Sequence, residues 1–286
     1  MLRNIKSYAK INISLNIKGK REDGYHELDS LMVPIELHDS IVISSLVGKE
    51  DNFVTVDDFS ELENRYNLVS TAINAMSERY GFKDKYRVFI HKVIPMQAGL
   101  GGGSSNAAFV MREVNSIQKL NLGEEELIEI ATPLGADIPF FIRCKPSRCG
   151  GIGEKLEPLE IKNNYYVLIV KPKKGCSTKE VFKLADNKPS YPQVDIDKVV
   201  DALKEGDDDK LAEYIGNSLE EAAISLNPEI QEIKDYLKAQ GLKLVLMSGS
   251  GSSVFALSTD KSILSKIEKV IYREDKWFCE LTKVIK

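Results

Sequence analysis

The sequence predicts an α+β fold built from two domains, and three observations carry that prediction. Residues 10–17 alternate as a strand does, a glycine-rich segment at residues 95–106 separates a strand-like run from a helix-like run, and the second half contains strand, helix, two strands, helix and strand in that order. The 286 residues are enough for two cores of medium size. We therefore predict an N-terminal domain at residues 1–153 and a C-terminal domain at residues 154–286.

The first predicted strand covers residues 10–17, in which apolar and polar residues alternate. Successive side chains of a strand point to opposite faces, so Lys10 and Asn12 share one face and can reach the same ligand. A face turned toward solvent is the alternative explanation for these polar residues. The residues expected to face a core are Ile11, Ile13, Leu15 and Ile17, and those on the other face are Lys10, Asn12, Ser14 and Asn16.

A turn is predicted at residues 18–26, where Asp23 and Gly24 form a typical turn pair. Tyr25 and His26 follow directly, and an aromatic ring beside an imidazole suits a planar ligand. The further elements expected before the glycine-rich segment are strands at residues 31–37, 41–45 and near 54, a helix at 66–80 capped by Gly81, and a strand at 86–90.

The glycine-rich segment at residues 95–106 predicts a phosphate site. Glycine permits positive φ angles and close approach of the backbone to a ligand, and the helix expected at residues 107–120 offers unpaired N–H groups and the positive end of its dipole. Ser104, Ser105 and Asn106 stand where a helix cap is expected. Ser104 replaces the lysine of a P-loop and the last glycine of a dinucleotide fingerprint, so neither a Walker-type ATPase nor a Rossmann dehydrogenase is indicated.

Asp137 lies in the otherwise apolar segment at residues 134–141, between Gly135 and two phenylalanines. Aspartate is rarely buried without a partner. The segment therefore indicates a positioned and partly desolvated carboxylate, and a helix or turn cap is the alternative.

The second half of the chain has the order expected of a split βαβ, ferredoxin-like domain with extra helices before its second strand. A second glycine-rich turn, at residues 150–154, precedes it and marks the predicted boundary. The expected elements are a strand at 165–170, a helix opening at Ser177, helices at 194–205, 210–226 and 229–240, a strand at 242–247, a glycine–serine turn at 248–253, a strand at 254–257, a helix at 261–272 and a strand at 277–284.

Composition excludes several classes of protein. A net charge of −4 without a basic stripe argues against nucleic-acid binding. The four cysteines, Cys144, Cys149, Cys176 and Cys279, match no zinc spacing and fit reduced thiols. Neither an apolar signal core nor a run long enough to span a membrane occurs. We therefore expect a cytoplasmic protein without membrane or nucleic-acid partners, and either a monomer or a homodimer.

Residues 9–12, 95–107 and 247–251 together resemble the conserved loops of the GHMP kinases, which phosphorylate galactose, homoserine, mevalonate and phosphomevalonate. The resemblance covers nearly the whole chain. It implies the two-domain fold of that family, with an N-terminal ATP-binding and catalytic domain of ribosomal-protein-like fold and a C-terminal ferredoxin-like domain on the substrate side.

Within the family, the chain is most similar to the branch that phosphorylates the 2-hydroxyl of a cytidine-diphosphate-linked methylerythritol, on residues 9–12, 21–26, 99–107 and 135–139. The resemblance implies ATP as co-substrate, Mg²⁺ as the expected ion, Asp137 as acceptor of the hydroxyl proton and Lys10 as the second catalytic residue. The residues implied to bind ATP are Pro95, Met96, Gln97, Ala98, Gly99, Leu100, Gly101, Gly102, Gly103, Ser104 and Ser105. The residues implied to bind the substrate are Asn12, Tyr25, His26, Phe182, Gly249, Ser250 and Gly251.

Three alternatives stay open. Another kinase of this family, acting on homoserine, a sugar or mevalonate, would need no base-stacking residues at positions 21–26. A non-catalytic nucleotide-binding module would bind ATP without turnover and would assign no special role to Lys10 or Asp137. A nicotinamide oxidoreductase is disfavoured by the failed dinucleotide fingerprint.

Overall fold

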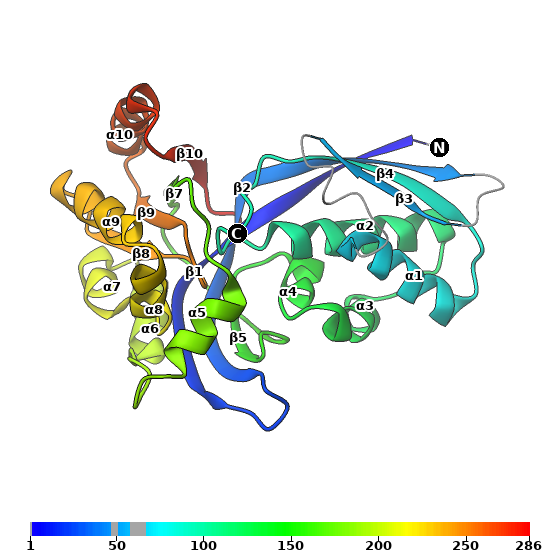
Figure 1. The fold of residues 1–286 in the computed structure, drawn as a ribbon, viewed down its shortest axis with the longest axis horizontal. Helices are drawn as coiled ribbons and strands as arrows, with labels where there is room; N and C mark the ends of the chain where they lie inside the picture. Colours follow the sequence, from blue (N-terminus) through cyan, green and yellow to red (C-terminus); the bar gives the residue numbers. More distant parts are fainter. Residues whose placement is uncertain (1, 47–50, 58–66) are drawn as a thin grey trace. The chain divides into compact units, whose positions relative to one another are not determined.

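The computed structural model describes residues 2–46, 51–57 and 67–286 (Figure 1). Contacts divide the chain into two compact, interleaved units. Unit 1 comprises Met1–Ala9, His38–Pro95 and Gly101–Cys144, and unit 2 comprises Lys10–Leu37, Met96–Leu100 and Lys145–Lys286. Two long strands, β1 (Leu2–Lys20) and β2 (His26–Leu46), contribute to both units.

In unit 1, helices cover one side of the strands. Residues 40–46 of β2 pair antiparallel with β4 (Lys85–His91), and β3 (Phe53–Val56) pairs parallel with β4. Along β4, Tyr86, Val88 and Ile90 are buried and their neighbours are not, as expected of a strand with one covered face. In Figure 1 the helices lie together along one side of β3 and β4. They are α1 (Leu68–Tyr80), α2 (Gly102–Gln118), α3 (Glu124–Ala131), the short 3₁₀ helix η2 (Thr132–Leu134) and α4 (Ile138–Arg143).

Unit 2 contains the predicted ferredoxin-like arrangement. Its four-stranded antiparallel sheet has the order β10-β7-β9-β8, and helices α9 and α10 pack on it. The strands are β7 (Tyr166–Lys171), β8 (Leu244–Met247), β9 (Val254–Ser258) and β10 (Phe278–Lys283). The helices are α5 (Thr178–Ala185), α6 (Ile196–Glu205), α7 (Asp208–Tyr214), α8 (Glu220–Leu226), α9 (Glu229–Ala239) and α10 (Lys261–Glu274).

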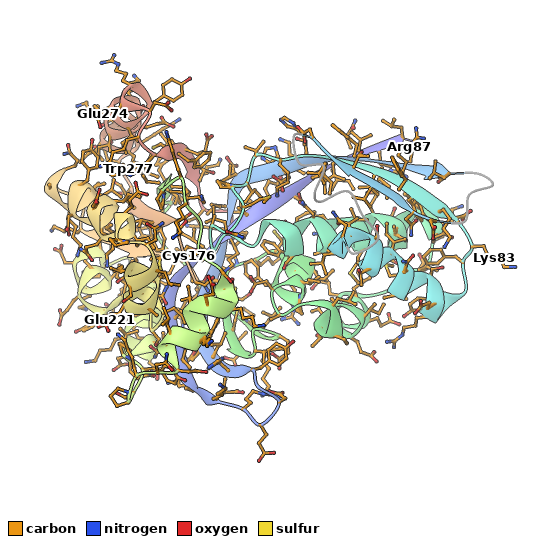
Figure 2. The ribbon with its side chains drawn as sticks, viewed as in Figure 1. Lys83, Arg87, Cys176, Glu221, Glu274 and Trp277 are labelled. Carbon is orange, nitrogen blue, oxygen red and sulfur yellow. The ribbon has the colours of Figure 1, made fainter. Side chains whose placement is uncertain are left out.

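The core of unit 2 is continuous from the sheet to helices α5, α8, α9 and α10. Trp277, labelled in Figure 2, is buried just before β10, and its ring centroid lies 5.6 Å from that of Tyr236 on α9. Cys176, also labelled there, is buried just before α5. All four cysteines are free thiols.

A hairpin of β5 (Ser147–Gly151) and β6 (Lys155–Pro158) extends the pairing of residues 28–32 of β2. The predicted domain boundary between residues 153 and 154 falls in the turn of this hairpin, inside unit 2. That boundary stays a prediction. Among the described residues, no helix is both long and apolar enough to cross a membrane.

The structure corrects the expectation that the polar side of residues 10–17 could face solvent. Lys10, Asn12, Ser14 and Asn16 are all buried. Residues 194 and 216 bond the last two, whereas Lys10 and Asn12 lie close to residues 248 and 249. Asn16 exchanges two hydrogen bonds with the backbone of Val194, at 2.7 and 3.0 Å, and the Gly216 N–H donates to Ser14 Oγ at 3.3 Å. Buried polar groups need hydrogen-bond partners, and these side chains have them. The alternation of polar and apolar residues therefore belongs to a strand that is buried on both faces.

Other element boundaries also differ from the predictions. Residues 31–37 and 41–45 belong to one strand, β2, rather than two, and the helix predicted at 210–226 is split into α7 and α8. The predicted helix at 66–80 is α1, which ends at Gly81 with φ of 73°, as expected, whereas residue 66 lies outside the described residues. Helix α2 begins at Gly102, so residues 102–106 are helical rather than loop.

Asp39 holds the segment that leads from β4 into the glycine-rich loop. It is fully buried, and its carboxylate accepts the N–H groups of Val93 and Ile94, each at 2.8 Å. The ammonium of Lys92, itself largely buried, pairs with the other carboxylate oxygen. One carboxylate therefore organises three successive residues just before Pro95.

We expect Asp39→Ala to lower the free energy of unfolding by about 3–5 kcal/mol, because it leaves the Lys92 ammonium buried without a partner. Urea unfolding followed by circular dichroism measures the change. The double variant Asp39→Ala/Lys92→Met removes both charges and should recover part of the loss. Equal losses in the single and double variants would contradict a role for the ion pair.

Candidate active site

The helix that follows the glycine-rich segment presents free donors at its start. Gly101 is the N-cap residue of α2 with φ of 72°, and no side chain caps the helix. The first intrahelical bond runs from the Ser105 N–H to the Gly101 carbonyl at 2.9 Å, so the N–H groups of residues 102–104 have no acceptor within the helix. These donors and the positive end of the helix dipole suit an anion such as phosphate.

Ser105 and Asn106, expected to cap the helix, instead tie it to β1 in unit 1. The Ser105 hydroxyl donates to the Tyr8 carbonyl at 2.6 Å, and the Ser7 hydroxyl donates to Asn106 Oδ1 at 2.6 Å. Both serve packing rather than capping, because glycine takes the N-cap position with a positive φ. Ser104 is the hydroxyl of this segment that neither bond uses.

In unit 2, residues 96–100 of the same segment are bonded to the glycine–serine turn at residues 248–253. The N–H groups of Ser252 and Ser253 donate to the carbonyls of Gln97 and Ala98 at 3.3 and 3.1 Å. The Ser248 hydroxyl donates to the Gly99 carbonyl at 2.9 Å. Two glycine-rich segments about 150 residues apart in the sequence thus form one backbone surface.

Gly99 lies at the closest point of this contact. Its φ is 72°, and a Cβ atom added there would be 2.0 Å from the backbone oxygen of Ser248 and 3.0 Å from the Gly251 nitrogen. No side chain fits at that distance, and L-residues rarely adopt that φ. Gly99 is therefore required for the packing of the two segments, whether or not a ligand is bound.

Lys10 and Asn12 lie beside this surface, also in unit 2. The Lys10 ammonium donates to Asn12 Oδ1 at 2.6 Å, and Asn12 Nδ2 donates to the Ser30 hydroxyl at 2.7 Å. The Asn12 N–H donates to Ser248 Oγ at 3.3 Å. A Cβ on Gly249 would lie 3.1 Å from Asn12 Oδ1 and 3.3 Å from Lys10 Nζ, so the backbone of the turn is close to both side chains.

The turn at residues 248–253 has partners that the sequence did not indicate. Asn217 Nδ2 donates to the carbonyls of Met247 and Gly249 at 3.0 and 2.8 Å, and so holds the turn from the side. The hydroxyls of Thr178 and Ser250 share a hydrogen bond at 2.9 Å. Asn217 belongs to no recognisable sequence motif, so its role in holding the turn is visible only in the folded chain.

A second group of predicted residues lies in unit 2 around His26. The imidazole is largely buried, its ring centroid is 4.6 Å from that of Phe182, and Nε2 lies 2.6 Å from Asp186 Oδ1. Tyr25, by contrast, is 58% exposed. The structure therefore brings His26 and Phe182 together and leaves the face of Tyr25 accessible.

Three residues that no sequence motif indicates also belong to this group: Asp186, Lys20 and Tyr191. Burial alone would raise the pKa of Asp186, but hydrogen bonds from Lys20, Tyr191 and His26 outweigh burial and hold that pKa well below its usual range. Asp186 is thus an ionised carboxylate at neutral pH. Its position four residues after Phe182, one helical turn, is the only signal that pointed to it.

Asp137 belongs to unit 1, directly before α4, and is partly exposed. It occupies the N-cap position of that helix, yet its side chain does not cap the helix. The structure thus does not bear out a helix cap, and a turn cap stays an open alternative. Pro139 stands in the first turn of α4, where its missing N–H costs nothing.

The glycines of the site allow a matched test. Gly99→Ala is expected to lower the free energy of unfolding by about 1–3 kcal/mol, because its Cβ would collide with the Ser248 carbonyl. Gly103→Ala is the control, since that position has open space and lies within α2. Thermal unfolding should show a loss for Gly99→Ala and none for Gly103→Ala. Equal unfolding temperatures would contradict the close packing.

Comparisons with known proteins agree with this geometry. The N-terminal domain of GHMP kinases matches residues 67–145, and the GHMP kinase C-terminal domain matches residues 199–274. The chain is 38% identical over 278 residues to 4-diphosphocytidyl-2-C-methyl-D-erythritol kinase of Bacillus licheniformis, covering 96% of this chain and 93% of that protein. It is 39% identical over 253 residues to a Streptococcus mutans protein named putative 4-diphosphocytidyl-2-C-methyl-D-erythritol kinase, covering 88% and 89%.

Solved structures show the same fold. A crystal structure of 4-(cytidine 5'-diphospho)-2C-methyl-D-erythritol kinase superimposes with a TM-score of 0.82 at 29% identity, covering 99% of this chain and all of that one. Homoserine kinase from Cytophaga hutchinsonii gives a TM-score of 0.76 at 18% identity over 99% and 94% of the two chains, which shows a shared fold alone. The chain belongs to the GHMP kinase family and is a relative of the 4-diphosphocytidyl-2-C-methyl-D-erythritol kinases within it.

Proposed function

We propose that this protein is an ATP-dependent kinase that phosphorylates the 2-hydroxyl of 4-diphosphocytidyl-2-C-methyl-D-erythritol, giving the 2-phosphate and ADP. The step belongs to the non-mevalonate route to isoprenoid precursors. Relatives that carry this name align with nearly the whole chain. The observation that carries the proposal is the buried Lys10–Asn12 pair beside the two bonded glycine-rich segments. The Lys10 ammonium and the backbone of the two segments together form a polar surface with a positive charge.

ATP would be held through its phosphates by the segment at residues 95–105. The free N–H groups at the start of α2 and the hydroxyl of Ser104 would donate to phosphate oxygens. Residues 95–100 would contribute backbone N–H groups and the shape that the bonded turn gives them. Ser105 would lie beside the phosphates through its place in the first turn of α2, although its hydroxyl donates to the Tyr8 carbonyl.

Asp137 would act as the general base. Its carboxylate takes the proton of the 2-hydroxyl as that oxygen forms a bond to the γ-phosphorus, and the bond from the γ-phosphorus to the bridging oxygen of ADP breaks. Lys10 would stabilise the negative charge of the transferring phosphoryl group. Its largely buried position strengthens that effect, because charges interact more strongly away from water.

The cytidine end of the substrate would lie against Tyr25, His26 and Phe182. Aromatic faces stack on bases, and an imidazole hydrogen-bonds a base edge. Asn12 would hydrogen-bond the polyol near the reacting hydroxyl. The backbone of Gly249, Ser250 and Gly251 would close over the substrate from the glycine–serine turn, whose glycines at 249 and 251 have positive φ.

Mg²⁺ is expected to accompany ATP, where it neutralises charge on the phosphates. Mg²⁺ usually keeps several waters and binds phosphates with one or two carboxylates. The described residues include no group of three or more His, Cys, Asp or Glu residues arranged for a metal ion. We therefore assign no protein ligand to Mg²⁺. The cytoplasmic location and the monomeric or homodimeric state also stay predictions.

Turnover with different acceptors tests the proposal. The protein with Mg-ATP should release ADP with 4-diphosphocytidyl-2-C-methyl-D-erythritol and give no more than background with homoserine, galactose or mevalonate, because only the first carries a base for Tyr25 and His26. A coupled ADP assay measures this. Turnover with one of the other acceptors would keep the kinase chemistry and reject the substrate. ATP binding without any turnover would favour the non-catalytic module.

Asp137→Asn should lower kcat at least about 10²-fold, because general-base catalysis typically contributes 10²–10⁴-fold. Binding of a non-hydrolysable ATP analogue, measured by calorimetry, should change little. Asp201→Asn, an exposed carboxylate on α6, is the control and should keep normal turnover. Near-normal kcat for Asp137→Asn would reject Asp137 as the base.

A further inference from the structure

Asp186, at the C-terminal end of α5, collects three hydrogen-bond donors. His26 Nε2 and the Tyr191 hydroxyl both lie on Oδ1, at 2.6 and 2.7 Å, and the Lys20 ammonium lies on Oδ2 at 2.6 Å. The donors come from the start of β2, the end of β1 and the chain after α5. One carboxylate thus joins three separate segments of unit 2.

This contact decides which nitrogen of His26 carries a proton. An ionised carboxylate only accepts hydrogen bonds, so the Nε2 atom that faces Asp186 must be the donor. In a neutral imidazole the other nitrogen, Nδ1, then has a lone pair and can only accept.

Lys20 and Tyr191 share this carboxylate with His26. The Lys20 ammonium lies on Oδ2, and the Tyr191 hydroxyl lies on Oδ1 beside His26 Nε2. Asp186 therefore has a cationic partner other than the imidazole. A neutral ring that donates from Nε2 satisfies the contact with Asp186 and leaves Nδ1 as an acceptor.

The ring is also held in place by its neighbours. Phe182 lies against it at 4.6 Å with 31° between the ring planes, and Tyr191 meets it edge-on at 6.2 Å and 85°. With one face, one edge and one nitrogen occupied, His26 cannot turn to exchange its two nitrogens without breaking the bond to Asp186.

We propose that Asp186 is a positioning residue that holds His26 in the Nε2–H tautomer, so that Nδ1 accepts a hydrogen bond from an amino group of the substrate base. Cytosine presents an N4 amino donor, whereas uracil presents an O4 acceptor at the same place. An acceptor facing an acceptor leaves both unpaired, which disfavours uracil. The inference rests on the proposed function, because it adds the reason why a cytidine compound rather than a uridine compound would be selected.

The tautomer is tested without any turnover. The chain has three histidines, so ¹⁵N-histidine labelling gives few imidazole signals, and His26→Ala assigns those of His26. At pH 7.5 the wild-type spectrum should show a protonated Nε2 and an unprotonated Nδ1. Asp186→Ala should give a mixture of tautomers. A protonated Nδ1 in the wild type, whether alone or in a cationic ring, would overturn the proposal.

Specificity is tested by calorimetric competition between CDP and UDP and by kinetics. The wild type should bind CDP at least tenfold more tightly than UDP, and Asp186→Ala should remove most of that preference. Asp186→Ala should also raise KM for the cytidyl substrate about tenfold, with kcat and KM for ATP within about twofold, as expected when only ground-state binding through His26 is lost. Asp186→Asn, whose amide oxygen can still accept from Nε2, should lie between the two.

Two variants separate positioning from a general structural role. Tyr191→Phe removes one donor from Asp186 but leaves the His26 bond, so it should retain the CDP preference. In a His26→Ala background, Asp186→Ala should change KM less than twofold further, because its effect passes through His26. Additive losses would overturn the proposal.

The two hypotheses fail differently. If the wild type phosphorylates the cytidyl substrate but Asp186→Ala keeps its CDP preference, the positioning role is overturned and the proposed function stands. If the wild type phosphorylates no cytidyl substrate and binds CDP and UDP equally, both the proposed function and the role of Asp186 in specificity are overturned, even with the Nε2–H tautomer observed.

Discussion

The close approach of Gly99 to the Ser248 carbonyl is the constraint on which the candidate site depends. At that distance only a residue without a Cβ fits, and the approach lets one segment accept backbone hydrogen bonds from the other at Gln97 and Ala98. Because backbone groups make most of the contact, its geometry depends little on side-chain rotamers. A site assembled in this way can present N–H groups to a ligand with little reorganisation, which is what phosphate binding and phosphoryl transfer require.

The polar side of β1 is a second unusual feature of the candidate site. A strand with two buried faces normally carries apolar residues on both, yet here Lys10, Asn12, Ser14 and Asn16 are buried and hydrogen-bonded. Their partners are backbone and side-chain groups from distant parts of unit 2. The first two of these residues face the glycine–serine turn, whereas the last two join β1 to residues 194 and 216. One face of one strand therefore carries both residues of the proposed site and the hydrogen bonds that join β1 to the rest of unit 2.

Two carboxylates do comparable work away from the proposed reaction. Asp39 in unit 1 arranges the chain that enters the glycine-rich segment, and Asp186 in unit 2 arranges the imidazole that faces the proposed base. Each accepts hydrogen bonds from several donors, including a lysine, so each side chain is held in place. Residues outside the proposed substrate contacts thus hold in place those that are proposed to make them.

The sequence by itself determined the α+β class, the ferredoxin-like order of the second half and the glycine-rich segment that leads into a helix. These features depend on local periodicity, turn chemistry and motif spacing, which can be read from the sequence before the chain is folded. Only the tertiary structure decided that the polar face of β1 is buried, that β2 is one strand, and that Asn217 and Asp186 support the site. Those outcomes depend on partners far away in the sequence, such as residue 194 for Asn16 and residue 26 for Asp186, and no local pattern encodes a contact across 160 residues.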